Sequence, residues 1–274
     1  MIIQHNMTAY NTNRQLGITN GNLAKASEKL SSGYRINRAG DDAAGLSISE
    51  KMRGQIRGLE QASTNAQDGI SLIQTAEGAL NEIHAILQRQ RELAVQASND
   101  TYIETDRQFI QDEIDQLTAE IDRIAAETEF NKMKLLDGTG ADGSGGYIFH
   151  VGANEGQVIE TSITEMTADA LSVSGQDLTS QDGAEAAITA FDTALETVST
   201  ERSKLGAVQN RLEHTIANAD NTAENLQAAE SRIRDIDMAE EMVKYSKDTI
   251  LQQAAQSMLA QANQSTQGVL SLLQ

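Results

Sequence analysis

The chain has 274 residues, carries a formal net charge of −19 and contains neither proline nor cysteine. These counts exclude a disulfide-stapled scaffold and a thiolate-zinc protein, and the acidity argues against a protein that neutralises nucleic acid or coats an anionic membrane. Because proline is the strongest helix breaker, its absence favours long uninterrupted helices.

The N-terminal segment, residues 1 to about 40, is predicted to form a helix with a thin apolar stripe. Ala9, Leu16, Leu23 and Leu30 are spaced by seven residues and have Asn, Thr and Gln around them. The first residues lack the basic and apolar regions of a secretory signal peptide, so no cleavable signal is expected.

Two longer helices are predicted next. The first, from about residue 47 to 98, carries a seven-residue apolar repeat made of Met52, Leu59, Ala66, Ile73, Leu80, Leu87 and Ala94. The second, from about 103 to 128, carries apolar residues in steps of three, four and seven. The link between them suits a reversal of the chain, with Asp100 or Thr101 as the cap of the second helix.

Residues 137–163 have a different character. A glycine-rich stretch at 137–146 precedes two runs of β-branched or aromatic residues, which a Gly/Asn turn separates. This pattern predicts a β-hairpin at 147–163. The aspartates of the glycine-rich stretch lack the ligand alternation and the final glutamate of a calcium loop, so no metal site is expected there.

A third long helix is predicted from about residue 184 to 236. Its seven-residue repeat consists of Ala184, Phe191, Val198, Leu205, Leu212, Ala219, Leu226 and Ile233. Repeats held this long mean helices that wrap around one another with a left-handed supercoil. At about 1.5 Å per residue, the two longest helices each measure roughly 75 to 80 Å. The fold class is therefore mainly α, a long antiparallel helical bundle or coiled-coil rod with a small β-hairpin region.

The C-terminal segment repeats the thin apolar stripe. Leu251, Met258 and Leu272 lie on it together with Val269, and no charged residue follows Asp248. Gln, Asn and Ser are frequent in this segment, which is costly in hydrocarbon, so a membrane span is not expected. We predict an amphipathic helix that packs in a protein interface, because such segments carry little charge.

Charge and pattern together predict three regions. Residues 1–45, with a net charge of +2, form an N-terminal arm and linker; residues 46–239 form an acidic helical rod; and residues 240–274, with a net charge of −1, form a C-terminal arm. Helices with thin stripes are marginal on their own in water, so we expect both arms to be largely disordered in the monomer. They would fold against each other and against neighbouring copies on assembly. The candidate assembly residues are Leu16, Leu23, Leu30, Leu251, Met258, Val269 and Leu272.

Several motifs resemble those of bacterial flagellins. They are LSSGYRINRAGDDAAGLSIS at 30–49, NAQDGISLIQTAEGAL at 65–80, LQRQRELAVQ at 87–96 and RIRDIDMAEE at 232–241. The resemblance covers both arms, roughly residues 1–136 and 184–274, and leaves only about fifty residues between them. It therefore indicates a short form without the outer variable domains that interrupt many flagellins.

The resemblance implies a structural role. Flagellins are subunits of the extracellular flagellar filament, in which paired terminal helices form an inner tube and the long-helix bundle an outer tube. It also implies export of the unfolded chain by the flagellar type III system, an export chaperone on the C-terminal helix, and flagellar cap and hook-associated proteins as partners. Two alternatives remain at this point: a hook-filament junction protein and a secreted coiled-coil binding module.

A further implied partner is the innate immune receptor Toll-like receptor 5. The positions that match the receptor contacts of similar flagellins are Arg89, Leu93 and Glu113. Arg89 and Leu93 are one helical turn apart and lie off the main apolar stripe, so we expect both to be exposed on one face. The other interpretation is that this face serves subunit contacts and that the receptor exploits it secondarily.

Enzyme chemistry finds no support in the sequence. The four histidines are dispersed, and no His-Glu-x-x-His pair or glycine-rich phosphate loop occurs. The many carboxylates on helix faces are typical of a solvated surface. We therefore expect no enzyme activity, no cofactor and no catalytic or metal-binding residue.

Overall fold

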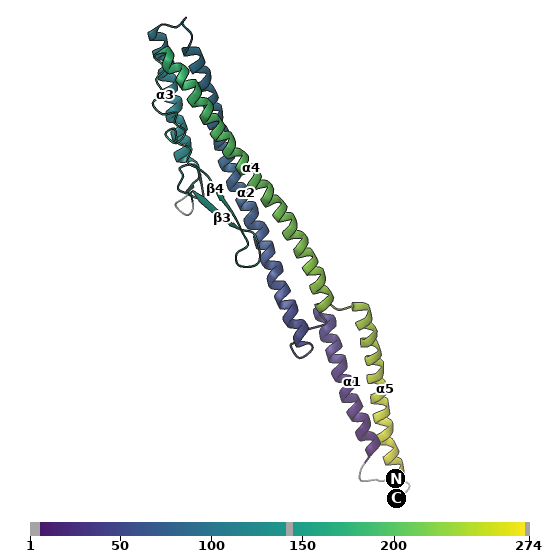
Figure 1. Ribbon diagram of the computed structural model, residues 1–274. Helices are drawn as coiled ribbons and strands as arrows, with labels where there is room; N and C mark the ends of the chain where they lie inside the picture. Colours follow the sequence, from purple (N-terminus) through teal and green to yellow (C-terminus); the bar gives the residue numbers. More distant parts are fainter. Residues whose placement is uncertain (1–5, 141–144, 272–274) are drawn as a thin grey trace. The chain divides into compact units, whose positions relative to one another are not determined.

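The computed structural model describes residues 6–140 and 145–271, with side chains up to residue 264 (Figure 1). Contacts divide the chain into two compact units, and we describe each by itself. The terminal unit comprises Met1–Gly54 and Asn225–Gln274, and the central unit comprises Gln55–Glu224.

Helices dominate the part of the chain that the structure describes. They are α1 (Met7–Ser32), α2 (Ala43–Ala97), α3 (Glu104–Glu127), α4 (Gln181–Arg234) and α5 (Met238–Ser271). The strands are short: β1 (Glu129–Phe130), β2 (Met133–Lys134), β3 (Gly146–His150) and β4 (Val158–Ser162). The predicted mainly α class with a small β region is confirmed, and the predicted long helices and hairpin lie within a few residues of the observed ones.

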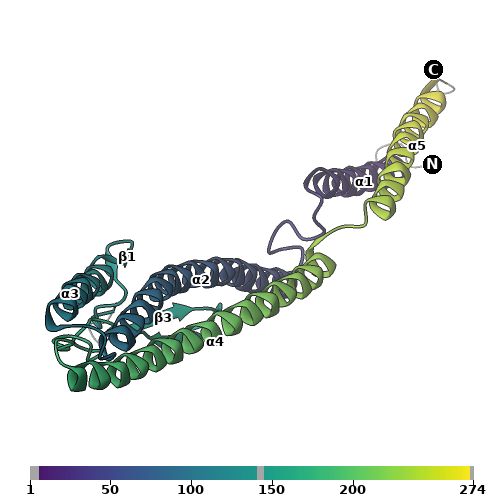
Figure 2. The ribbon, with the colours of Figure 1, turned by 90° about the horizontal axis from the view of Figure 1, so that it is seen from above.

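In the central unit α2 and α4 run antiparallel alongside one another (Figure 2). Two ion pairs between these helices fix their direction: Arg91 with Asp192 at 2.5 Å and Arg202 with Glu77 at 3.6 Å. The predicted seven-residue repeats of both helices supply the core, because their side chains are almost fully withdrawn from water. The core residues from these repeats include Ile73, Leu80, Leu87, Ala94, Phe191, Val198, Leu205 and Leu212.

The third helix, α3, packs antiparallel on the C-terminal part of α2. The buried Gln90 side chain donates a hydrogen bond to Thr118 Oγ1 at 2.9 Å. The guanidinium of Arg107 donates to the backbone oxygens of Ala97 at 2.9 Å and Asn99 at 3.3 Å. The end of α2, which lacks intrahelical partners for its last carbonyls, is thereby tied to the start of α3.

The predicted cap of the second helix is wrong. Neither Asp100 nor Thr101 caps α3, which begins at Glu104 after Ile103. Instead the Ile103 N–H donates to Asp106 Oδ2 at 3.4 Å. The helix starts one residue later than the predicted start at about residue 103, and Ile103 is its N-cap residue.

The hairpin of β3 and β4 closes over α2. Its antiparallel register pairs Phe149 with Ile159. Two glycines of α2 permit the close approach: a Cβ on Gly69 would lie 2.9 Å from Phe149 Cδ1, and a Cβ on Gly58 would lie 2.9 Å from Ala153 Cβ. Such distances are shorter than van der Waals contact, so the hairpin needs glycine at these helix positions.

We expect Gly58→Ala to be less stable than Gly78→Ala by about 1–3 kcal/mol. Both variants gain the same helix propensity, but a Cβ on Gly58 collides with the backbone of the hairpin loop, whereas nothing lies within 4 Å of a Cβ on Gly78. Urea unfolding of the two variants measures the difference. Equal unfolding free energies would show that the loop does not dock on α2 as described.

In the terminal unit the ends of α1 are well defined by local chemistry. The Asn6 side chain accepts a hydrogen bond from the Ala9 N–H at 3.1 Å, as an N-cap residue does. The helix stops at Gly33, which has φ +75° and donates its N–H to the Lys29 oxygen at 2.9 Å. Glycine adopts this left-handed conformation without a steric penalty.

Candidate assembly and partner surfaces

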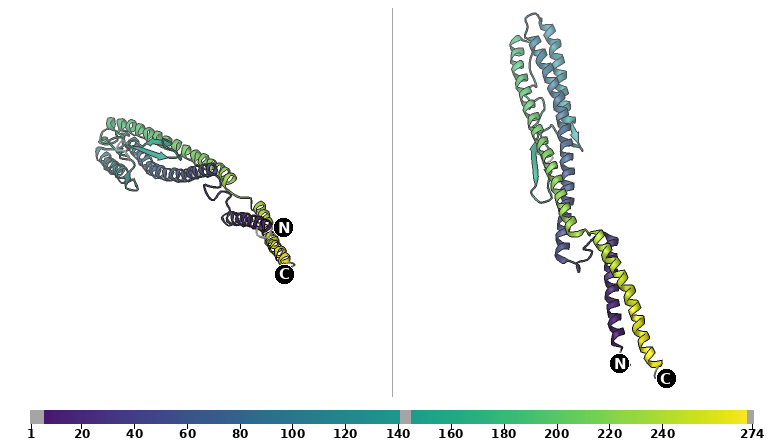
Figure 3. Two further views of the ribbon diagram at one scale, coloured as in Figure 1. Left: turned by 90° about the horizontal axis from the view of Figure 1, so that it is seen from below. Right: turned by 90° about the vertical axis from the view of Figure 1, so that its right-hand side faces the viewer.

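The terminal helices α1 and α5 lie side by side and antiparallel (Figure 3). The Asn6 amide donates to the Ala262 oxygen at 2.9 Å, and the Gln252 amide donates to Asn20 Oδ1 at 2.8 Å. Both segments are continuous helices in the structure. The prediction from the sequence, that the two arms are largely disordered in a dilute monomer, concerns the protein in solution and stays a prediction. Their pairing is shallow: the buried side chains among the described part of these two helices are Ala26, Glu241 and Ala262.

Two of the predicted assembly stripes do not face each other. Leu16, Leu23 and Leu30 of α1 are half-buried, but Leu251 and Met258 of α5 are 45% and 61% exposed. Within one copy, the predicted α5 residues are therefore left open for contacts with neighbouring copies, and their part in assembly stays a prediction. Their exposure results from the rotation of α5, which turns Gln252, Ala255 and Ala262 toward the interior of the unit. Among the other candidates, the Val269 side chain and Leu272 lie outside the described residues.

The rotation leaves an apolar surface on α5, which we call the outer face of α5. It consists of Val243, Ile250, Leu251 and Met258. On α1 a smaller apolar surface is exposed, which we call the outer face of α1. It consists of Met7, Tyr10 and Ile18. Several large apolar side chains exposed on one helix are typical of a site of protein association rather than of a solvated exterior.

In the terminal unit, a short β-bridge connects the loop after α1 to the segment that follows α4. Residues 33–35 and 234–236 form an antiparallel bridge, with backbone N–H to oxygen distances of 2.7 and 3.1 Å. The guanidinium of Arg234 lies 4.8 Å from the centre of the Tyr34 ring and 3.1 Å from Glu50 Oε1. The end of α4, the loop after α1 and the start of α2 are thus held together by one arginine.

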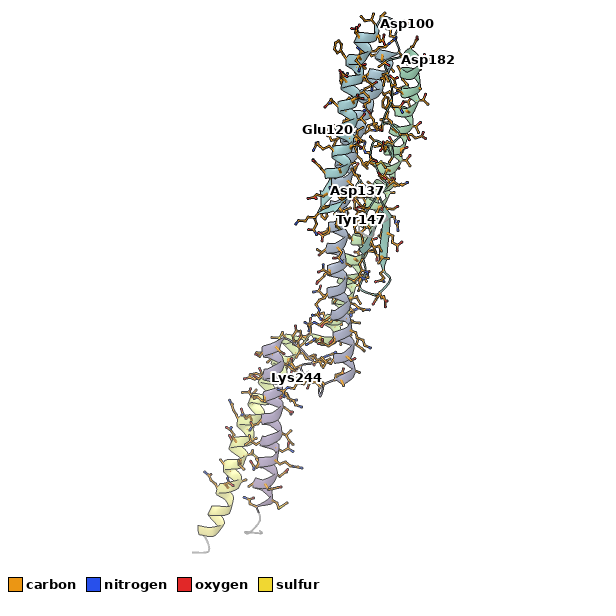
Figure 4. The ribbon with its side chains drawn as sticks, turned by 90° about the vertical axis from the view of Figure 1, so that its left-hand side faces the viewer. Asp100, Glu120, Asp137, Tyr147, Asp182 and Lys244 are labelled. Atoms are coloured by element: carbon orange, nitrogen blue, oxygen red, sulfur yellow. The ribbon has the colours of Figure 1, made fainter. Side chains whose placement is uncertain are left out.

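The charges divide unequally between the units. The terminal unit has eleven basic and ten acidic residues, whereas the central unit has ten basic and thirty acidic residues. Net charges of +1 and −20 follow, which add to the −19 of the chain. Asp100 and Glu120 are two of the exposed carboxylates of the central unit (Figure 4). The apolar outer faces of α1 and α5 thus lie on the unit that is nearly neutral, and not on the acidic one.

Arg89 and Glu113 form an exposed ion pair across α2 and α3. Arg89 Nη2 lies 2.9 Å from Glu113 Oε1, and a second guanidinium nitrogen, Nη1, lies 3.4 Å from Glu92 Oε2. The Arg89 and Glu113 side chains are 50% and 45% exposed. Hydrogen bonding to Glu113 holds the pKa of the Arg89 guanidinium above its ordinary value, so Arg89 keeps its positive charge.

The predicted exposure of Leu93 is wrong. Its side chain is 2% exposed and belongs to the core of the central unit. The main stripe of α2 faces α4, but α3 covers a second face of α2 that the stripe does not reveal. Leu93 lies on that second face, as does Gln90, and both are buried there. Of the three candidate receptor residues, the structure exposes Arg89 and Glu113.

Sequence patterns missed three exposed apolar side chains near the α2–α3 turn. Val95 of α2, Ile103 of the turn and Phe109 of α3 are 49%, 65% and 72% exposed. Phe109 directly precedes the stripe residue Ile110, which is buried, so adjacency in the sequence gave no sign that the two side chains point in different directions.

Among the described residues no cluster of three or more His, Asp or Glu side chains could hold a metal ion. None of the helices there is both long and apolar enough to cross a membrane.

Both helical arms match known family models. Residues 3–141 match the model of the bacterial flagellin N-terminal helical region, and residues 188–273 match the model of the flagellin C-terminal helical region. The chain belongs to the flagellin family. As a flagellin it is a structural subunit of the flagellar filament.

Individual relatives agree with this assignment. The chain is 58% identical over 275 residues to a flagellin of Halalkalibacterium halodurans and 55% identical over 303 residues to a flagellin of Bacillus subtilis, with 100% of both chains covered in each case. It also resembles the crystal structure of Bacillus cereus flagellin, with 33% identity and a TM-score of 0.50 over 61% of this chain and 94% of that one. The prediction of a short flagellin is confirmed.

Proposed function

We propose that this flagellin polymerises through the outer faces of α1 and α5 into the filament that drives swimming. The observation that carries the proposal is the exposed apolar surface of Val243, Ile250, Leu251 and Met258 on a unit of net charge +1. The terminal helices of neighbouring subunits can associate through this surface, because burial of apolar surface is favourable. The low net charge of the terminal unit keeps electrostatic repulsion between the subunits small.

The uneven charge along the chain supports a different place in the filament for each predicted region. Residues 1–45 and 240–274 form the inner layer, where the copies crowd together. Residues 46–239 form the outer layer, whose negative charge keeps free subunits and filaments soluble. The role is mechanical, so it needs neither a cofactor nor a catalytic residue, and no nucleic acid or membrane takes part.

We also propose an export route and assembly partners, which rest on membership of the flagellin family. The chain would leave the cell unfolded through the flagellar type III system and act outside it. Before export, a flagellin chaperone would cover the outer face of α5 and prevent premature association. New subunits would add beneath the flagellar cap, and hook-associated proteins would seat the first copies.

Electron microscopy of the purified full-length protein tests this function. We expect long tubular filaments after the monomer is seeded with filament fragments. Particles that bind filament ends without elongating would instead indicate a hook-filament junction protein. Failure to form any ordered assembly over a wide range of salt concentration would contradict the proposal and favour a coiled-coil binding module.

A second proposed partner is Toll-like receptor 5, which would recognise the free monomer. The exposed pair Arg89 and Glu113 supports this proposal, because arginine is enriched among interface hot spots and the ion pair holds the Arg89 side chain in place. Leu93 lies beneath the pair in the core, so its part would be to support the surface rather than to contact the receptor.

We expect Arg89→Ala combined with Glu113→Ala to weaken receptor binding at least about tenfold, the usual size of a hot-spot loss. Binding of the monomer to the immobilised receptor ectodomain measures the effect. Arg123→Ala is the matched control, since Arg123 is also exposed and ion-paired in the central unit. Unchanged affinity of the double variant would refute the assignment. Leu93→Ala is unsuitable as a probe, because it opens a cavity in the core.

A further inference from the structure

The exposed methionines of the chain lie on the terminal helices. Among the residues that the structure describes, four methionines are exposed, one on α1 and three on α5: Met7, Met238, Met242 and Met258. Met52 and Met133 are half-buried, and Met166 of the central unit is fully buried. The accessible thioethers are therefore concentrated on the two helices that carry the apolar outer faces.

Methionine is the side chain of this protein that a peroxide oxidises most readily. The chain contains no cysteine and no tryptophan, and the thioether sulfur is soft and polarizable. Reaction needs access of the oxidant to the sulfur, so exposure decides which methionines react. In a single chain Met7 and Met258, which are 69% and 61% exposed, are open to such an oxidant, whereas the core shields Met166.

The four exposed methionines differ in their relation to the outer faces. Met7 belongs to the outer face of α1 and Met258 to the outer face of α5. Met242 is turned by about 100° around the helix from its neighbour Val243, which begins the outer face of α5. Met238 lies one helical turn before Met242, on the same side. Met238 and Met242 are thus equally suitable for oxidation but lie beside the proposed interface.

Oxidation would change the chemistry of an outer face. A sulfoxide replaces an apolar thioether by a polar group whose oxygen accepts hydrogen bonds, and this change disrupts interfaces that contain methionine. On an exposed helix the new oxygen is hydrated, so the single chain loses little. In a packed interface the oxygen would lose its water, and a buried polar group without a partner is costly.

We propose that Met7 and Met258 are oxidation sites through which a peroxide blocks the assembly of free subunits. In the reaction the sulfur lone pair attacks one peroxide oxygen, the S–O bond forms as the O–O bond breaks, and water leaves with both protons. The sulfur is oxidised by two electrons and the peroxide is reduced. The inference rests on the proposed polymerisation and adds a chemical control to its apolar contacts.

Packing in a filament should protect the same two sulfurs. We expect peptide mass spectrometry after a short treatment with hydrogen peroxide to show Met7 and Met258 oxidised at least about tenfold faster in monomer than in filament. Met166 should react slowly in both states, because its core is complete in the single chain. Equal oxidation of Met7 and Met258 in monomer and filament would overturn the inference.

Assembly of oxidised monomer measures the effect directly. Monomer is treated until both sulfoxides are detected, the peroxide is removed, and filament fragments are added as seeds. We expect the critical concentration to rise at least about tenfold, because apolar burial is lost and polar groups are buried in its place. Two methionine sulfoxide reductases, one for each sulfoxide epimer, should restore the original value.

Two leucine variants assign the effect to particular sulfurs. Leucine keeps an apolar side chain of similar volume but cannot form a sulfoxide. We expect Met7→Leu with Met258→Leu to have the same critical concentration before and after peroxide treatment. Met238→Leu with Met242→Leu is the matched control, which peroxide should inhibit as it inhibits the wild type. Circular dichroism verifies that the treated and untreated monomers fold alike.

The outcomes separate the two proposals. An untreated wild-type protein that forms no filaments would overturn the proposed function and this inference together. The inference alone would be overturned by oxidised wild-type protein that assembles at the untreated concentration, or by a Met7→Leu, Met258→Leu variant that peroxide still inhibits.

Discussion

Replacing Leu251 and Met258 by serine should abolish filament assembly and leave the monomer folded. Both side chains are exposed, at 45% and 61%, so their loss removes little from the single chain. In a filament each would be buried, and full burial of a Leu or Met side chain contributes about 1.5–3 kcal/mol. Because about half of each side chain is still exposed in the single chain, the two changes together correspond to a rise of about 10–10² in the critical concentration.

Sedimentation after seeding with wild-type fragments measures this effect. Ile148→Ser is the matched control, because Ile148 is also 61% exposed but lies on β3 of the central unit. The control should assemble as the wild type does. Assembly of the Leu251→Ser, Met258→Ser variant at the wild-type concentration would mean that the outer face of α5 is not a subunit interface.

Replacing Phe191 by alanine should destabilise the central unit by about 3–5 kcal/mol. Phe191 is fully buried between the helices, and alanine would leave a cavity that the rigid antiparallel pair cannot close. Urea unfolding followed by circular dichroism measures the loss.

Phe109→Ala provides the comparison for this experiment. Phe109 is 72% exposed on α3, so the same chemical change should cost less than about 0.5 kcal/mol. If the two variants unfold at the same urea concentration, the core of α2 and α4 is not packed as described.

The long helices could be predicted from the sequence because their cause is local and repeated. A residue such as Leu80 or Leu205 recurs every seven positions, and both lie fully buried in the core of the central unit. The absence of proline removes the main reason for such helices to break. The hairpin was likewise predictable from its glycine-rich turns.

The candidate site was less predictable, because its residues depend on packing between elements. Periodicity assigns α2 one stripe, but only the position of α3 makes Leu93 a core residue. The repeat also fails to show which way α5 rotates, so the exposure of Leu251 could not be foreseen.

The short two-stranded sheet of β1 and β2 could not be predicted from the sequence either. Its turn places Asn131 at φ +50° and Lys132 at φ +66°, a conformation that usually calls for glycine at the second position. A lysine there gives no turn signal in the sequence. The contacts of the flanking residues Phe130 and Met133 with the core supply what the local sequence lacks.

The central claim is that the terminal helices provide the contacts of the filament. Few side chains of α1 and α5 are buried within one copy, so we expect their backbone amides to exchange rapidly in dilute monomer. In the filament, packing of α1 and α5 against neighbouring subunits should protect their backbone amides from solvent. The core of α2 and α4, by contrast, is complete in the single chain and should exchange slowly in both states.

Hydrogen exchange compared between dilute monomer and filament is the most direct test. The account predicts that exchange in α1 and α5 slows by at least about a hundredfold on assembly, which corresponds to roughly 3 kcal/mol of added protection. Strong protection of α1 and α5 already in the monomer, or unchanged exchange of these helices in the filament, would contradict it.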